Sequence, residues 1–201
     1  MIRRPHADAP GRRRVLLGAG TALSALVLAA CGTDTSDRYD TGFVSGDGVA
    51  TEISPEDRGE ALEFSGTTYQ GETWDLTDHR QEVVVLNVWY AACAPCRAEA
   101  PDLKEIAEQY AEQDVTFLGI NVRDEAGPAQ AFERTYEIPY PSVPDLDAQI
   151  MYRLRGQVAP NAVPSTLVLD REGRVAARIS GAIEPGTLRA MIERVLEEND
   201  Q

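Results

Sequence analysis

Two cysteines with two residues between them, Cys93 and Cys96, are the part of this chain best suited to chemistry. They follow an apolar run, Val83–Val88, whose β-branched residues predict a buried strand. The pattern after the pair is helical, so the sequence places the cysteines at a helix N-terminus. The partial positive charge and unpaired N–H groups there favour a thiolate over a thiol. Cys93 is therefore expected to be nucleophilic near neutral pH, with Cys96 close enough to form a disulfide.

Three interpretations of the pair follow from the residues alone. In thiol–disulfide exchange, Cys93 attacks or receives attack, and Cys96 resolves the mixed disulfide. An inert structural disulfide would close so small a loop that chain entropy would add little stability. A closed metal site would need further nitrogen or sulfur ligands, and after removal of an N-terminal signal only Cys31 and His79 would remain. The sequence favours exchange and predicts neither a metal nor a cofactor.

Two neighbours of the pair have alternative roles. Glu99 lies three residues after Cys96, about one helical turn on, where its carboxyl group could take or give the Cys96 proton. It could equally be an ordinary acidic residue in the first turn, favoured by the helix dipole. Trp89 precedes the pair and is either a core residue or a cover over the disulfide. The residues alone leave both questions open.

The region around the pair resembles the thioredoxin superfamily, and more closely the membrane-tethered bacterial thiol–disulfide oxidoreductases of the TlpA/ResA kind. The likeness extends over roughly residues 60–198. Members usually carry Trp directly before the first cysteine, where this chain has Ala92, a departure that affects exposure and substrate preference more than the chemistry. The residues that carry the resemblance are Asn87, Trp89, Cys93, Pro95, Cys96, Glu99 and Pro101, followed by Val163, Pro164, Ser165 and Thr166.

The resemblance implies roles that the residues alone do not. It gives Glu99 the proton-transfer role beside Cys96, since related enzymes carry Glu at this place. It makes Pro164 a cis proline that packs against the cysteine pair, whereas a trans proline opening a strand is the ordinary alternative. It also implies that Val163 binds an extended partner chain through its backbone, as an added strand. Trp89 would complete the substrate-binding residues.

The rest of the pattern predicts the elements that position the pair. A βαβ unit is followed by a ββα unit, which predicts an α/β fold with a central mixed β-sheet flanked by helices. The resemblance implies that this is the thioredoxin-like fold. A short N-terminal β-hairpin is expected as an extension. The expected ranges are a hairpin at 61–69, strands at 83–88, 115–122, 165–169 and 174–179, a loop at 138–141, and helices at 128–136, at 148–154 and from 185.

Residues 1–30 are interpreted as an export signal, because arginines precede an apolar stretch of signal-peptide length. The arginines at 12–14 resemble a twin-arginine signal, although a Sec signal can also carry several arginines. Residues 28–31 resemble a bacterial lipobox, in which Cys31 would carry the lipid chains of a stable anchor. An uncleaved membrane helix is the alternative. Residues 31–58 then predict a flexible tether, and 59–201 the thioredoxin-like domain.

The charge of the chain limits its partners. Net charge is −14 over 201 residues, and residues 1–30 contribute +4, so the remainder carries −18. So acidic a domain argues against nucleic-acid binding, which relies on Lys and Arg at phosphates. It argues equally against binding to anionic lipid through a cluster of basic residues.

Three function classes remain for comparison. A peroxidase of the peroxiredoxin kind would, by resemblance, carry Thr where this chain has Tyr90, and a copper-delivery module would have three residues between its cysteines and a distal His. The sequence therefore favours a thiol–disulfide oxidoreductase at the extracytoplasmic face of the bacterial membrane. The resemblance implies that a membrane thiol transporter keeps the pair reduced and that exported proteins, such as apocytochrome c or copper-site proteins, are its substrates. A disulfide-forming oxidase is the second reading.

Overall fold

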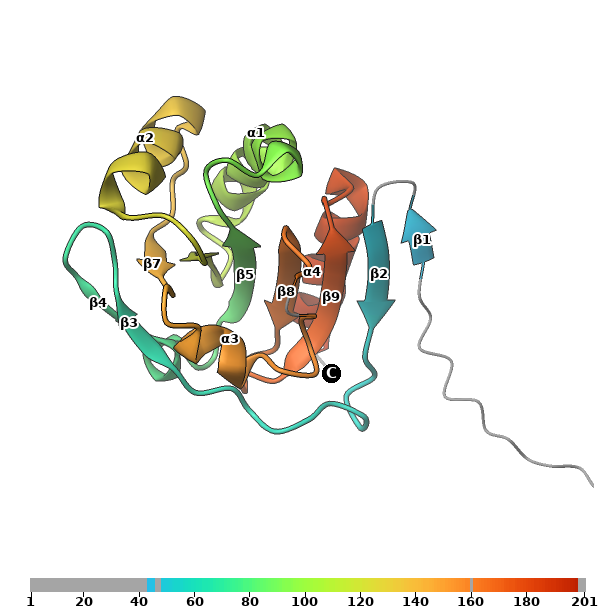
Figure 1. Cartoon of the computed structure of the whole chain (residues 1–201). Coiled ribbons are helices and arrows are strands. Elements are labelled where there is room, and N and C mark those ends of the chain that lie inside the picture. The colour runs from blue at the N-terminus through green and yellow to red at the C-terminus, as the bar shows by residue number, and fades with distance from the viewer. Residues whose placement is uncertain (1–42, 46–47, 160, 199–201) are drawn as a thin grey trace, which may run out of the picture. The chain divides into compact units, whose positions relative to one another are not determined.

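The computed structural model describes residues 43–45, 48–159 and 161–198, all within the compact unit Arg38–Gln201 (Figure 1). The expected signal peptide at 1–30, the expected lipid-attachment residue Cys31 and residues 32–42 of the expected tether lie outside the described residues. None of the helices in the described part has the length and apolar character that crossing a bilayer requires.

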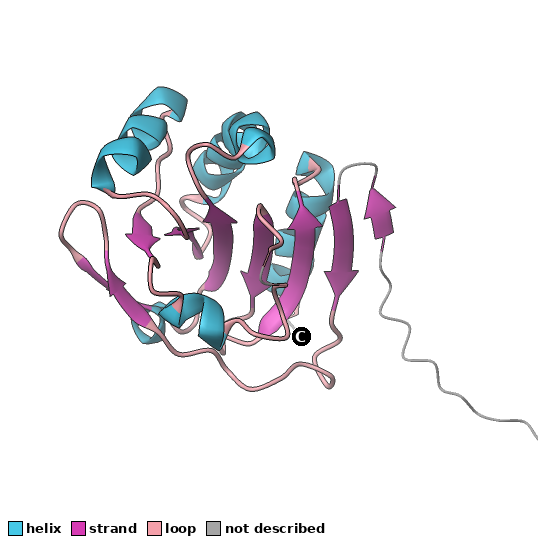
Figure 2. Cartoon of the chain, viewed as in Figure 1, coloured by secondary structure: helices cyan, strands magenta, loops and turns pink. Residues whose placement is uncertain are grey.

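A seven-stranded mixed sheet forms the centre of this unit, with strand order β1-β2-β9-β8-β5-β6-β7 (Figures 1 and 2). β5 runs parallel to β6 and β6 parallel to β7, whereas the other neighbouring strands are antiparallel. β3 and β4 form a separate two-stranded sheet. The strands are β1 (Phe43–Ser45), β2 (Gly48–Glu52), β3 (Ser65–Thr67), β4 (Thr73–Asp75), β5 (Val83–Trp89), β6 (Val115–Asn121), β7 (Ser142–Pro144), β8 (Ser165–Leu169) and β9 (Val175–Gly181).

Strand β5 is buried along its whole length because its two faces meet different layers. Val83 and Val85 pack in a cluster with the buried faces of α1 (Ala94–Tyr110) and α4 (Pro185–Glu197). Val84, Leu86 and Val88 pack on the opposite face against β4, the 3₁₀ helix η1 (Leu76–His79) and α3 (Gln149–Arg153). This double burial explains the continuous apolar run in the sequence. The expected mixed sheet with helices on both faces is confirmed.

The order of elements around the cysteine pair also follows the sequence pattern. β5, α1 and β6 form the βαβ unit, and β8, β9 and α4 form the ββα unit. The strand expected at 165–169 has those bounds, and the helix expected from residue 185 is α4. α2 (Ala126–Tyr136) begins two residues before the expected start of its helix. Thus the elements that carry strong apolar periodicity lie where the sequence puts them.

The start of the folded domain is the main correction. Residues 48–52, expected to belong to a flexible tether, form β2, which pairs with β9 on one side and with the edge strand β1 on the other. Ala50 is buried there, and Arg58 lies 3.1 Å from Asp170 and 2.6 Å from Glu198 in ion pairs. β1 and β2 are outer strands held mainly by backbone hydrogen bonds, so they need few apolar residues and leave a weak sequence signal.

The N-terminal hairpin exists, but its strands lie elsewhere than expected. The expected strands at 61–64 and 67–69 give way to β3 and β4, which pair Ser65 with Asp75 and Thr67 with Thr73. The chain turns at Gly71, whose φ of +89° suits glycine. β7 was not expected, because three residues ending in Pro144 carry no clear strand pattern.

Gly119 of β6 lies where the backbone passes close to two side chains. An added Cβ there would lie 2.7 Å from Trp89 Nε1 and closer still to the Ser142 hydroxyl oxygen. Gly119→Ala is therefore expected to lower the free energy of unfolding by roughly 1–3 kcal/mol, measured by urea titration. The control Gly59→Ala meets no atom within 4 Å and should change stability by less than about 0.5 kcal/mol. Equal stabilities of the two variants would contradict this account.

Candidate active site

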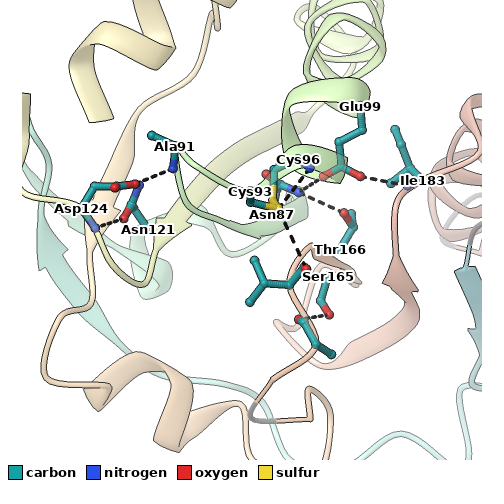
Figure 3. The surroundings of a disulfide bond; sticks show 12 residues. Asn87, Ala91, Cys93, Cys96, Glu99, Asn121, Asp124, Ser165, Thr166 and Ile183 are labelled. Atoms are coloured by element: carbon teal, nitrogen blue, oxygen red, sulfur yellow. Dashed lines mark hydrogen bonds between the residues drawn. A yellow bond between two sulfur atoms is a disulfide. The ribbon is translucent and has the colours of Figure 1, made fainter. Parts of the chain in front are cut away.

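The cysteine pair lies at the N-terminus of α1, as the sequence indicates (Figure 3). Cys93 is the N-cap residue, and its sulfur accepts a hydrogen bond from the Cys96 N–H at 3.2 Å. Cys93 and Cys96 form a disulfide with a Cα–Cα distance of 5.2 Å. Pro95 occupies the first turn, where its missing N–H leaves no helical bond unmade. The helix N-terminus therefore directs its N–H groups and partial positive charge at the Cys93 sulfur.

The loop between β5 and α1 is held from a neighbouring strand end. Asp124 accepts a hydrogen bond from the Ala91 N–H at 2.5 Å and another from the Asn121 side-chain amide at 2.9 Å (Figure 3). The Tyr90 carbonyl in turn accepts from the Cys93 N–H. Asn121 and Asp124 were not predicted as site residues. Asn121 ends β6, the parallel strand beside β5, and Asp124 follows it, so both lie at the carboxyl end of β6, next to this loop.

The two sulfurs are largely shielded from solvent. Cys93 and Cys96 are each 2% exposed, whereas Ala92 is exposed. The Cys93 sulfur lies 4.0 Å from the Val163 carbonyl oxygen, on the segment that precedes β8. The Cys93 sulfur thus lies next to the exposed Ala92 and the half-buried Val163.

The Val163–Pro164 peptide bond is cis, as the resemblance implies. Pro164 is buried, and its carbonyl accepts a hydrogen bond from the Gly181 N–H at 2.9 Å. The Ser165 hydroxyl donates to the Ala162 carbonyl at 2.7 Å (Figure 3). These bonds fix the half-buried Val163 beside the cysteine pair.

Trp89 lies beneath the pair rather than on the surface. It is 3% exposed and belongs to a buried cluster with Cys93, Cys96 and Ala100. Its ring centroid is 4.3 Å from that of Phe132 on α2. This position favours the core-packing interpretation of Trp89 over a direct substrate contact.

Glu99 is a buried carboxyl group one turn along α1 from Cys96, and it is 2% exposed. The Asn87 side-chain amide donates to its Oε1 at 3.0 Å, and the Ile183 N–H donates to its Oε2 at 2.9 Å (Figure 3). Burial raises the pKa of Glu99 to about 7, the two hydrogen bonds oppose that rise, and the charge of Asp102 adds to it. Glu99 therefore exchanges a proton near neutral pH, which an ordinary exposed first-turn acid would not do.

A surface groove runs beside Glu99. It has a volume of about 560 Å³, and its walls come from α1, from the segment before β8 and from the turn before α4. Pro95, Val163, Pro164 and Ile183 supply apolar wall, and Glu99 and Asp102 supply carboxyl groups. The groove thus brings together three of the residues that the sequence analysis singled out, Glu99, Val163 and Pro164. Among the described residues, no cluster of three or more His, Cys, Asp or Glu side chains could hold a metal ion.

Fold and site together define a thioredoxin-like thiol–disulfide oxidoreductase with a Cys93–Cys96 redox pair. Residues 58–178 match the AhpC/TSA family, and the chain belongs to that family.

Individual relatives agree with this class. The chain is 27% identical over 135 residues to the thiol-disulfide oxidoreductase ResA of Geobacillus thermodenitrificans, covering 67% of this chain and 75% of that protein. A secreted thiol-disulfide isomerase from Corynebacterium glutamicum has a similar structure, with a TM-score of 0.68 and 31% identity over 78% of this chain and 99% of that one. A DsbF homologue from Corynebacterium diphtheriae gives a TM-score of 0.64 and 33% identity over 72% and 92%.

Proposed function

We propose that this protein reduces disulfides of exported proteins outside the cytoplasm. The observation that supports this most directly is the placement of the Cys93 sulfur at the N-cap of α1, with a buried carboxyl group of near-neutral pKa one turn on. That arrangement supplies an attacking thiolate and a proton acceptor for the second cysteine. Exported proteins are the proposed substrates because residues 1–30 resemble an export signal and a related structure is that of a secreted isomerase.

The proposed cycle starts from the reduced pair. The Cys93 thiolate attacks one sulfur of the partner disulfide, a mixed disulfide forms, and the first partner thiolate leaves and takes a proton from water. Cys96 then gives its proton to Glu99 and attacks the Cys93 sulfur. The mixed disulfide breaks, the second partner thiolate leaves, and the Cys93–Cys96 disulfide forms. Two electrons have passed to the partner, and a membrane thiol transporter returns them.

The partner chain would bind as an extended segment across Val163. The Val163 backbone lies next to the Cys93 sulfur, and apolar side chains line the groove beside Glu99. Backbone hydrogen bonds to an added strand tolerate varied side chains. Such binding suits an enzyme that meets several protein substrates, for example apocytochrome c or copper-site proteins.

The proposed location follows from the N-terminal segment. Cleavage after residue 30 would leave Cys31 as a lipid-bearing first residue at the outer face of the bacterial membrane. The tether would run from there to residue 42, since β1 begins at Phe43. Twelve residues of flexible chain span about 20 Å, so the domain would stay close to the membrane and to its electron donor.

The direction of electron flow is tested by the reduction potential of the pair. A reductase should have a potential near or below the roughly −270 mV of thioredoxin. The measurement equilibrates the full chain in dithiothreitol redox buffers and counts free thiols by alkylation. A value near the roughly −120 mV of a strong oxidase would refute the reductase and support the alternative, a disulfide-forming oxidase.

A further inference from the structure

A second, narrow cavity lies on the side of Cys96 that faces away from the groove. Its volume is about 10 Å³, close to the least volume that can hold one ordered water molecule. The residues on its wall with polar side-chain groups are Asn87, Trp89, Tyr140 and Ser142, and Cys96 itself forms part of the wall. The remaining wall is largely apolar, so a water here would be confined to these few partners.

Two buried oxygens near this cavity form no well-aligned hydrogen bond. Ser142 Oγ, on a residue with no exposed surface, and Glu133 Oε1, on a residue 8% exposed, have no partner of good hydrogen-bond geometry among the described residues. The Ser142 hydroxyl still lies close enough to the Glu133 carboxyl group to favour its charged form. Buried polar atoms are nearly always paired with protein or ordered water, and leaving one unpaired costs about 1–3 kcal/mol. Ser142 lines the cavity, so a water in the cavity would satisfy its hydroxyl group.

Glu133 connects this region to solvent. Its Oε2 accepts a hydrogen bond from the Gln70 side-chain amide at 3.2 Å. Burial raises the pKa of Glu133, and the nearby Ser142 hydroxyl, Gln70 and Arg134 oppose that rise. Glu133 also lines an open surface groove with Gln70, Arg134 and Tyr140, so a proton that it accepts can leave through that groove.

Tyr140 lines both the narrow cavity beside Cys96 and the outer groove beside Glu133. Burial raises its pKa, and the charges of Glu99 and Glu133 both add to the rise. Tyr140 therefore connects the cavity that Cys96 lines with the groove that Glu133 lines.

We propose that the cavity holds one ordered water, which links Cys96 through Ser142 to Glu133 as a second path for the Cys96 proton. The proton of the Cys96 thiol passes to the water, a water proton passes to Ser142, and the Ser142 proton passes to Glu133. Cys96 becomes a thiolate, Glu133 becomes neutral, and water and Ser142 are unchanged. The resulting thiolate then breaks the mixed disulfide. This inference rests on the proposed role of Cys96 as resolving cysteine.

The second path has a use that the first lacks. Glu99 lies in the groove where the partner chain is proposed to bind. A bound partner would therefore block the release of a proton from Glu99 to solvent. Glu133 opens onto a groove lined by α2 and by the segment before β7, on the side of the sheet remote from β9. A proton can leave by that side while the partner is still attached.

The test follows the resolving step in a single turnover of the reduced full chain with a disulfide peptide. In the Glu99→Gln background, which removes the first path, Ser142→Val should slow resolution by a further factor of about 10 and leave the first attack by Cys93 unchanged. Ser142→Ala removes the hydroxyl without adding volume, and should slow the same step if the valine variant fails to fold. The control Thr51→Val, in the same background, replaces a buried hydroxyl on β2 at the far side of the sheet and should change neither phase.

Crystal structures of the oxidised wild type and of Ser142→Val supply the second readout. A water within hydrogen-bond distance of Ser142 Oγ in the wild type, absent from the variant, supports the proposal. An empty wild-type cavity, or a resolving step that Ser142→Val and Ser142→Ala both leave unchanged in the Glu99→Gln background, would overturn it. If the wild type forms no mixed disulfide that Cys96 resolves, the proposed function itself is wrong, so the two failures are distinct.

Discussion

Cys93→Ser is expected to lower the kcat/KM for reduction of protein disulfides by at least roughly 1000-fold, because a serine hydroxyl is scarcely ionised and is a poor nucleophile toward sulfur. The N-terminus of α1 stabilises a thiolate at this position, and it cannot ionise an alcohol to a useful extent. The measurement is dithiol-dependent reduction of insulin disulfides by the full chain. The loss should be complete within error because the remaining Cys96 is buried.

Cys96→Ala is the matched comparison for Cys93→Ser. It keeps the attacking thiolate and removes the resolving one, so the first step should proceed and a mixed disulfide between Cys93 and the substrate should accumulate. Mass spectrometry under non-reducing conditions detects that adduct. Turnover in Cys93→Ser close to that of the wild type, or a substrate adduct that accumulates on Cys96 of Cys93→Ser and not on Cys93 of Cys96→Ala, would reverse the assigned roles.

The elements that could be predicted from the sequence are those in which burial produces a regular pattern of apolar residues. β5 is enclosed on both faces, so its residues are continuously apolar, and α4 shows one apolar face over Leu188, Met191, Ile192 and Val195. β1, β2 and β7 were not predicted, because strands at or next to the edge of the sheet are held mainly by their backbones, which any sequence supplies. The cysteine pair was found because its chemistry depends on local spacing along a single helix.

The surroundings of the pair were harder to predict, since they depend on contacts between distant segments. Glu99 is bonded by Asn87, from 12 positions earlier, and by Ile183, from 84 positions later. No spacing rule brings these together, and the burial that distinguishes Glu99 from an ordinary first-turn acid depends on them. Ser142 and Glu133 gave no signal for the same reason, because neither looks functional until the fold places it near Cys96.

Glu99→Gln should slow the opening of the oxidised pair by a dithiol about 10-fold below neutral pH. Opening expels Cys96 as a thiolate, and a neutral Glu99 one turn away can give it a proton, which an amide cannot. Since the pKa of Glu99 is raised to about 7, the wild type holds this proton below pH 7 and loses it above. The rates of wild type and variant, corrected for ionisation of the dithiol, should therefore converge as pH rises through neutrality. Equal rates at about pH 6 would exclude Glu99 as the proton donor.

The same substitution should also change how stability depends on pH. A carboxyl group whose folded pKa lies above its unfolded value of 4.5 binds more protons when folded, so the wild type loses stability as pH rises from about 4.5 to about 7. Glu99→Gln carries no such charge, and its stability relative to wild type should increase by roughly 2 to 3 kcal/mol between about pH 5 and about pH 8. Urea titrations of the oxidised proteins at both pH values measure this difference. A constant difference would mean that Glu99 is already ionised at pH 5, and its hydrogen bonds to Asn87 and Ile183 would then serve only to hold α1 in place.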